Sequence, residues 1–164
     1  MRKFAAHFLF PGNEKPIAKG TVQVDSSGLI LDIIKPTGPF REEAGLEFHN
    51  GIICPAFVNV YHEFEPARFY RKFPALRPFE SLCPERLNTE KDLLGWLKAI
   101  QMDNQNISLE QLIRIFTLDS AKSISLDKEL GSIEKGKRPG LMLISGMDYQ
   151  KLRLTENSHL KMLI

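Results

Sequence analysis

Apolar and polar residues alternate along the first third of the chain, a pattern that is typical of half-buried strands. Strands are predicted over residues 4–10, 20–25 and 29–35, and β-branched residues are frequent in the second and third. Residues 46–49 alternate in the same way, and the dipeptide Asn50-Gly51 that follows favours a tight turn. The pattern therefore predicts short strands joined by turns.

The apolar spacing becomes helical after residue 88. Thr89 is followed three residues later by Asp92, and apolar residues then recur at intervals of three and four up to residue 101. Ser108 and Gln111 form a second capping box, which opens a helix with one apolar face. Residues 89–126 are therefore predicted to be helical.

The segment before these helices, residues 66–88, has a different character. It is rich in proline and arginine, and its aromatic residues follow no period, so we expect an irregular loop that lays aromatic side chains over a core. Beyond the helices, residues 131–144 predict two strands separated by turns. The apolar tail, residues 154–164, is expected to dock on these strands.

Composition narrows the functional classes. The 164 residues carry a net charge of +2 with 26% charged residues, whereas nucleic-acid-binding proteins usually show a basic face, so no nucleic acid partner is expected. No run of 18 apolar residues occurs, so no membrane partner is expected either. Cys54 and Cys83 stand outside any ligand-spaced pattern and fit a reducing compartment. We expect a cytoplasmic protein.

Two runs of residues carry a more specific signal. Residues 51–65 read Gly-Ile-Ile-Cys-Pro-Ala-Phe-Val-Asn-Val-Tyr-His-Glu-Phe-Glu. The second run contains, in order, Thr117, Ala121, Lys122, Gly131, Ile133, Gly136 and Lys137. Together they resemble the two ends of enzymes of the amidohydrolase superfamily, in its metal-dependent chlorohydrolase and cytosine-deaminase-like group. The resemblance implies a (β/α)8 barrel between the runs, a metal site after its first strand, and hydrolysis of carbon-nitrogen bonds other than peptide bonds.

The distance between the two runs excludes that barrel. Only residues 66–107 separate them, whereas a (β/α)8 barrel takes about 250 residues. We therefore expect an α+β fold, a truncated form without a complete TIM barrel. Residues 1–58 and 128–146 would build a small composite β-sandwich, joined to two or three helices in a single composite domain, residues 1–164.

The resemblance also locates the metal ligands. It implies histidines where this chain has Tyr61 and Glu63, with His62 between them, and a phenol is a poor ligand at neutral pH. The aspartate that it implies near residues 82–84 is absent. We therefore predict no catalytic residue, no cofactor-binding residue and no bound cofactor. The candidate metal ligands are His62, Glu63 and Glu65.

Two functions remain open from the sequence. The first is a non-catalytic binding or assembly module, or a relic of a parent gene that lost its barrel by deletion. The alternative is a metal-dependent hydrolase acting on non-peptide carbon-nitrogen bonds, in which His62, Glu63 and Glu65 bind zinc, iron or nickel with further ligands from a second subunit. The sequence identifies no small-molecule ligand.

Loss of the barrel predicts self-association. In the resembled enzymes the barrel covers the strand through residue 58 and the terminal helices, so its removal would leave an apolar face in water. A symmetric homodimer, or a larger homo-oligomer, is the commonest way to cover such a face. The residues expected at the contact are Phe57, Val58, Phe69, Tyr70, Phe73 and, as a secondary candidate, Trp96.

Overall fold

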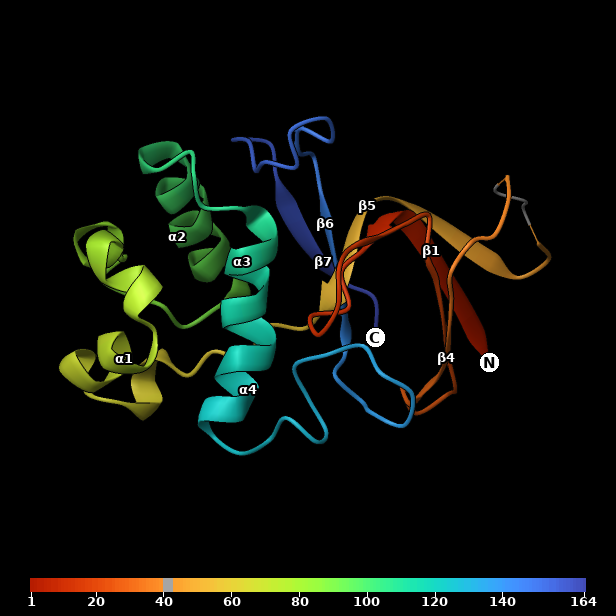
Figure 1. Cartoon of the computed structure of the whole chain (residues 1–164), viewed down its shortest axis with the longest axis horizontal. Coiled ribbons are helices and arrows are strands. Elements are labelled where there is room, and N and C mark those ends of the chain that lie inside the picture. Colours follow the sequence, from red (N-terminus) through yellow and green to blue (C-terminus); the bar gives the residue numbers. More distant parts are fainter. Residues whose placement is uncertain (40–42) are drawn as a thin grey trace.

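Strands from both ends of the chain form one open sheet in the computed structural model, which describes residues 1–39 and 43–164 (Figure 1). The seven strands found in these residues are β1 (Arg2–Leu9), β2 (Ile17–Ala18), β3 (Thr21–Val24), β4 (Ile30–Ile34), β5 (Leu46–Pro55), β6 (Leu141–Ser145) and β7 (His159–Met162). Their order is β4-β3-β1-β5-β6-β7, and β2 pairs with β1. β1 and β5 are parallel, and the other pairs are antiparallel.

The expected α+β class is confirmed, and the described residues contain no closed barrel. The N-terminal and C-terminal segments meet where β5 pairs with β6, so the sheet is composite as predicted. We expected two packed sheets, whereas the described strands make a single curled one. The reason is that β5 runs unbroken from the N-terminal strands to β6 and joins all of them.

Asn50 and Gly51 lie inside β5. The tight turn predicted at these two residues is therefore wrong. β1 and β5 change register between Ala6 and Phe8, where β5 has one residue more, and this β-bulge bends β5 (Figure 1). A Cβ on Gly51 would lie 2.3 Å from the carbonyl oxygen of Ile144. The glycine is therefore required by the close approach of β6 and not by a turn.

The two faces of β5 and β6 pack against different parts of the chain. Ile53 and Leu143 point into a core that the N-terminal strands enclose, with Val22 and Ile30. The alternate residues point the other way, toward the helices, because side chains change face at every residue of a strand. These residues are Ile52, Cys54, Met142 and Ile144.

The C-terminal tail docks on the sheet as a strand. β7 pairs with β6 from Ser145 and His159 to Met142 and Met162. The pairing continues beyond β7, because the amide of Leu163 donates to the carbonyl of Leu141. The expected docking is confirmed, and β7 forms one edge of the sheet.

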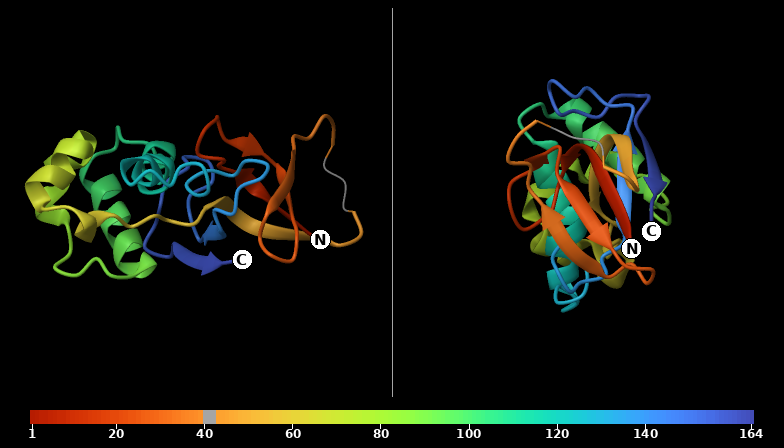
Figure 2. Two further views of the ribbon diagram at one scale, coloured as in Figure 1. Left: turned by 90° about the horizontal axis from the view of Figure 1, so that it is seen from below. Right: turned by 90° about the vertical axis from the view of Figure 1, so that its right-hand side faces the viewer.

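The helical half of the molecule lies beside the sheet (Figures 1 and 2). Both capping boxes predicted from the sequence are formed, at Thr89 with Asp92 and at Ser108 with Gln111. None of the helices in the described residues is long and apolar enough to cross a membrane. The helical elements are η1 (Tyr61–Glu63), α1 (Pro66–Lys72), η2 (Pro74–Leu82), α2 (Glu90–Asp103), α3 (Leu109–Arg114), η3 (Ile115–Asp119) and α4 (Ser120–Ser123).

Residues 66–88 are helical over most of their length, so the prediction of an irregular loop is wrong. Pro66 and Pro74 stand in the first turns of α1 and η2, where the missing amide hydrogen removes no helical hydrogen bond. Phe69 and Phe79 are buried and anchor these short helices to the core. One or two turns are too few for a helical period to appear in the sequence.

α3, η3 and α4 form one continuous helix, residues 109–123, between the sheet and the other helices (Figure 1). Leu109 and Ile113 contact the helix-facing side of the sheet. Leu112 and Phe116 belong instead to the core of the helical half. We call residues 109–123 the central helix, because it is buried on two sides.

A loop of residues 131–137 ties the central helix to the N-terminal strands. Gly131 has a φ of 81°, and a Cβ there would lie 2.7 Å from the Cβ of Ala121, so the loop touches the helix through a glycine. The amide of Ile133 donates to the carbonyl of Pro11 at 2.8 Å. Two strands are expected after residue 131, and the structure has one of them, β6. The first expected strand is a loop, which these contacts hold in place.

Lys137 is the polar anchor of this loop. Its ammonium group donates to the carbonyl of Asp127 at 2.6 Å, to the hydroxyl of Ser132 at 2.7 Å and to the carboxylate of Glu134 at 2.7 Å. The bond with Lys137 holds the pKa of Glu134 below its usual value. Because Ser132 is fully buried and the Lys137 side chain is only 14% exposed, water cannot easily replace this donor.

We predict that Lys137→Met lowers the free energy of unfolding by about 1–3 kcal/mol, because partly buried acceptors lose a charged donor. Lys135→Met replaces an exposed lysine of the same loop and should change the free energy of unfolding by less than about 0.5 kcal/mol. Denaturant unfolding of both variants makes the comparison. Equal losses in the two variants would show that Lys137 does not anchor the loop.

Candidate functional site

The segment that resembles the metal motif leaves β5 and enters the helical half. The amide of Val58 donates to the carbonyl of Phe116 in the central helix at 2.7 Å. The side-chain amide of Asn59 donates to the carbonyl of Leu87 at 2.6 Å, and its carbonyl oxygen accepts the amide hydrogen of Tyr61 at 3.1 Å. The motif is therefore positioned by bonds to helical segments. The role of Asn59 was missed from the sequence, since both its partners are main-chain groups.

Tyr61 occupies the position of the first implied histidine, and its ring points into an aromatic cluster. The ring centroid lies 5.0 Å from that of Phe69 and 6.1 Å from that of Trp96, in edge-to-face arrangements. Trp96 is itself buried, and its indole nitrogen donates to the carbonyl of Phe79 at 3.2 Å. Aromatic packing thus fills the place where the resemblance implies a metal ligand.

The titratable side chains that pack in this cluster are those of Tyr61, Tyr70 and Cys83. Burial is the main cause that raises the pKa of all three groups above their ordinary values. Within the described chain, no well-formed hydrogen bond reaches the Tyr70 hydroxyl, although the Tyr61 hydroxyl is near enough to affect its pKa. Neutral phenols and a neutral thiol are poor metal ligands, so these three side chains do not make a metal site.

The three candidate metal ligands lie on the surface of the same region. His62 and Glu63 belong to η1, Glu65 precedes α1, and all three side chains are exposed. The ring of His62 stands edge-on to that of Tyr61, with centroids 5.2 Å apart. In the part of the chain that the structure describes, no group of three or more histidine, cysteine, aspartate or glutamate side chains is arranged to hold a metal ion.

The aromatic cluster also changes the expected subunit contact. Phe69, Tyr70, Phe73 and Trp96 are each at most 5% exposed, because residues 66–88 and α2 bury them within their own chain. They cannot form the predicted homodimer contact, so that part of the prediction is wrong. Self-association, with the partly buried Phe57 and Val58 near the contact or through another surface, stays a prediction.

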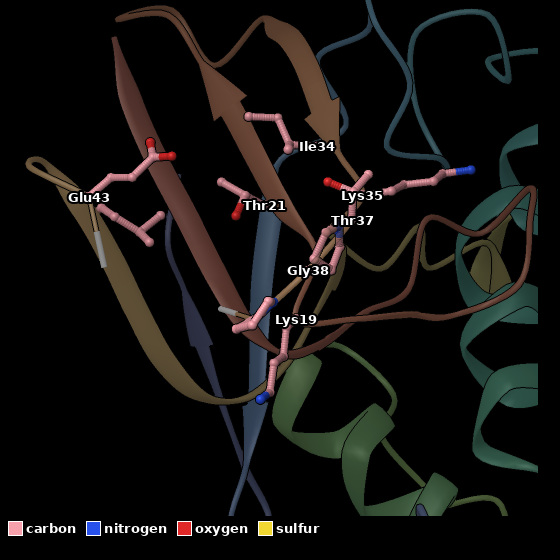
Figure 3. A pocket seen from close by; sticks show the side chains of 10 residues that line it. Lys19, Thr21, Ile34, Lys35, Thr37, Gly38 and Glu43 are labelled. Atoms are coloured by element: carbon pink, nitrogen blue, oxygen red, sulfur yellow. The ribbon is translucent and has the colours of Figure 1, made fainter. Parts of the chain in front are cut away.

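A hollow of about 380 Å³ lies beside β3 and β4 (Figure 3). Two of its charged residues are paired elsewhere: Lys35 with Glu14 at 2.6 Å, and Glu43 with Lys3 at 2.8 Å. Figure 3 shows the Lys35 side chain extending away from Thr21 and the rest of the lining. The described lining residues, which include Pro39 and Glu43, gather no catalytic set.

A second groove, of about 460 Å³, lies between α2 and the edge strand β7. Its floor and walls are mainly apolar, with Leu94 from α2 and Leu160 and Met162 from β7. Lys91 and Lys98 of α2 also line it. Sequence reasoning missed this groove, because β7 and α2 are far apart in the chain and their juxtaposition depends on the docking of the tail.

Two comparisons of the sequence agree with the motif resemblance. Residues 87–162 match the amidohydrolase family. Imidazolonepropionase from Picrophilus torridus is 45% identical over 47 residues, which are 29% of this chain and 12% of that protein. The crystal structure of A. niger ochratoxinase aligns with a TM-score of 0.26 and 16% identity, over 43% of this chain and 22% of that one. The aligned parts span much less than two thirds of either relative.

The family match begins before α2 and ends within β7, so it contains the central helix and the loop at residues 131–137. The second motif run lies entirely within it, and its Gly131 and Lys137 hold the contacts described above. The sequence matches therefore support a relationship of residues 87–162 to the amidohydrolase superfamily.

Proposed function

We propose that this chain is a non-catalytic amidohydrolase relative that acts as a binding or assembly module. The observation that carries the proposal is the packing of Tyr61 on Phe69 and Trp96, where the resemblance implies a metal-binding histidine. The Tyr61 ring stands in the place of the ligand. It packs there against the buried side chains of the helical half.

Self-association and a cytoplasmic location are part of the same proposal. Cys54 and Cys83 are both free thiols, as is common in reducing compartments. β4 and β7 form the two edges of the sheet, and an edge strand is a surface on which another chain can pair. An assembly role would use such surfaces and would need no chemistry from Tyr61.

The alternative is a metal-dependent hydrolase of non-peptide carbon-nitrogen bonds. The exposure of His62 and Glu63 is the observation in its favour, because both side chains are open to ligands from a second subunit. The resemblance to amidohydrolases supplies the reaction class. A catalytic zinc needs about three protein ligands and an open position, so the second subunit would have to complete this set.

We predict that the purified protein holds no stoichiometric zinc, iron or nickel after incubation with each ion and buffer exchange. Elemental analysis measures the metal content, and hydrolysis of cyclic amides and amidines is assayed on the same samples. One ion per chain that is lost in Glu63→Ala and retained in Glu85→Ala would instead establish the hydrolase alternative.

The packing role of Tyr61 gives a separate prediction. Tyr61→Ala should lower the free energy of unfolding by about 2–3 kcal/mol, because a partly buried ring leaves the aromatic cluster. His62→Ala removes the adjacent exposed ring and should change the free energy of unfolding by less than about 0.5 kcal/mol. Thermal and denaturant unfolding compare the two variants. A larger loss in His62→Ala would contradict the assignment of Tyr61 as the packed residue.

A further inference from the structure

β7 and α2 lie beside each other at the end of the sheet nearest the helices (Figure 1). Residues of both elements line the apolar groove described above. In the described chain, β7 pairs with β6 on one side and has no strand on the other. Met162 is 48% exposed at this edge. An edge strand beside a helix is a geometry that can accept an extended peptide as one more strand.

Gly95 is an independent sign of an occupant. It lies inside the 14-residue helix α2, where glycine is less favourable than alanine, and it lines the groove. A Cβ at this position would meet no atom within 4 Å, so the packing of the chain itself does not require a glycine. A backbone that passes close to α2 along the groove would require one.

The charges beside the groove indicate what the occupant carries. Lys91 and Lys98 flank Gly95 on the same side of α2, about 10 Å apart along the helix axis. No ion pair within the described residues involves either lysine, and Lys98 donates to the main-chain carbonyl of Glu156. Glu90 at the start of α2 is the acidic residue of the lining. The lysines outnumber it, so the groove favours an acidic occupant.

We propose that this groove binds an extended acidic peptide of a partner protein, which pairs with β7 as an additional strand. One apolar side chain of the peptide enters the space beside Gly95, and acidic residues two positions before and after it reach Lys91 and Lys98. Side chains four residues apart on a strand are separated by about 13 Å, which the flexible lysine stems can span. The inference rests on the proposed binding role and names its partner. The groove shares no residue with the aromatic cluster around Tyr61, so the peptide test and the metal test can fail independently.

The test uses the full chain and a fluorescent, end-capped peptide. Its sequence is Thr-Glu-Thr-Leu-Thr-Glu-Thr, so that leucine and both glutamates point to the same side of the strand. We expect saturable binding that weakens as salt is added, with shifts of the backbone amide signals of Leu160 and Met162. Gly95→Leu should weaken binding at least tenfold without lowering the thermal midpoint, because leucine is the better helix former. The double variant Lys91→Glu/Lys98→Glu should weaken it similarly, whereas Lys128→Glu/Lys135→Glu should not.

Several results would overturn the proposal. These are absence of peptide binding, equal binding by Gly95→Leu, and equal binding of a peptide with lysine in place of glutamate. Decanoate binding in the groove without peptide binding would identify a small-molecule site instead. Concentration-dependent dimerisation that Gly95→Leu abolishes, without peptide binding, would identify a second copy of the chain as the occupant.

Discussion

The central helix is the element on which both halves of the molecule depend. Its residues Leu109 and Ile113 close one face of the sheet, and Leu112 and Phe116 close the aromatic cluster. Neither half has a complete core without it, because a sheet face and a set of short helices each need apolar cover. The hydrogen bond from Val58 to Phe116 adds a polar link between the same parts.

The motif residues that this chain shares with amidohydrolases serve that arrangement. Gly131 touches the central helix where a larger residue would collide with Ala121, and Lys137 holds the loop that follows. Val58, from the first run, donates its amide hydrogen to Phe116 of the central helix, and Tyr61 and Asn59 hold the same segment to Phe69 and Leu87. The two runs thus account for packing without any chemistry at the implied metal position, which is the physical basis of the proposed non-catalytic role.

Local signals predicted the parts of the fold that depend on local physics. The capping boxes could be recognised because their interactions lie within three residues. The strands could be recognised because burial of one face leaves an alternating pattern within each segment, although their partners are distant in sequence. Gly51 was misread as a turn residue, since its cause is the approach of β6, which is distant in sequence. Residues 66–88 were misread because their helices are short. The groove beside β7 could not be predicted, as its walls come from α2 and the docked tail.

The central claim is that the sheet and the aromatic cluster form one cooperative unit through the central helix. Native-state hydrogen exchange followed by NMR tests this most directly. We expect the amides of β5, β6, α2 and the central helix, and that of Val58, to exchange through one opening with the free energy of global unfolding. An opening of α2 and the Val58 amide at a much lower free energy, with β5 and β6 still protected, would contradict the account.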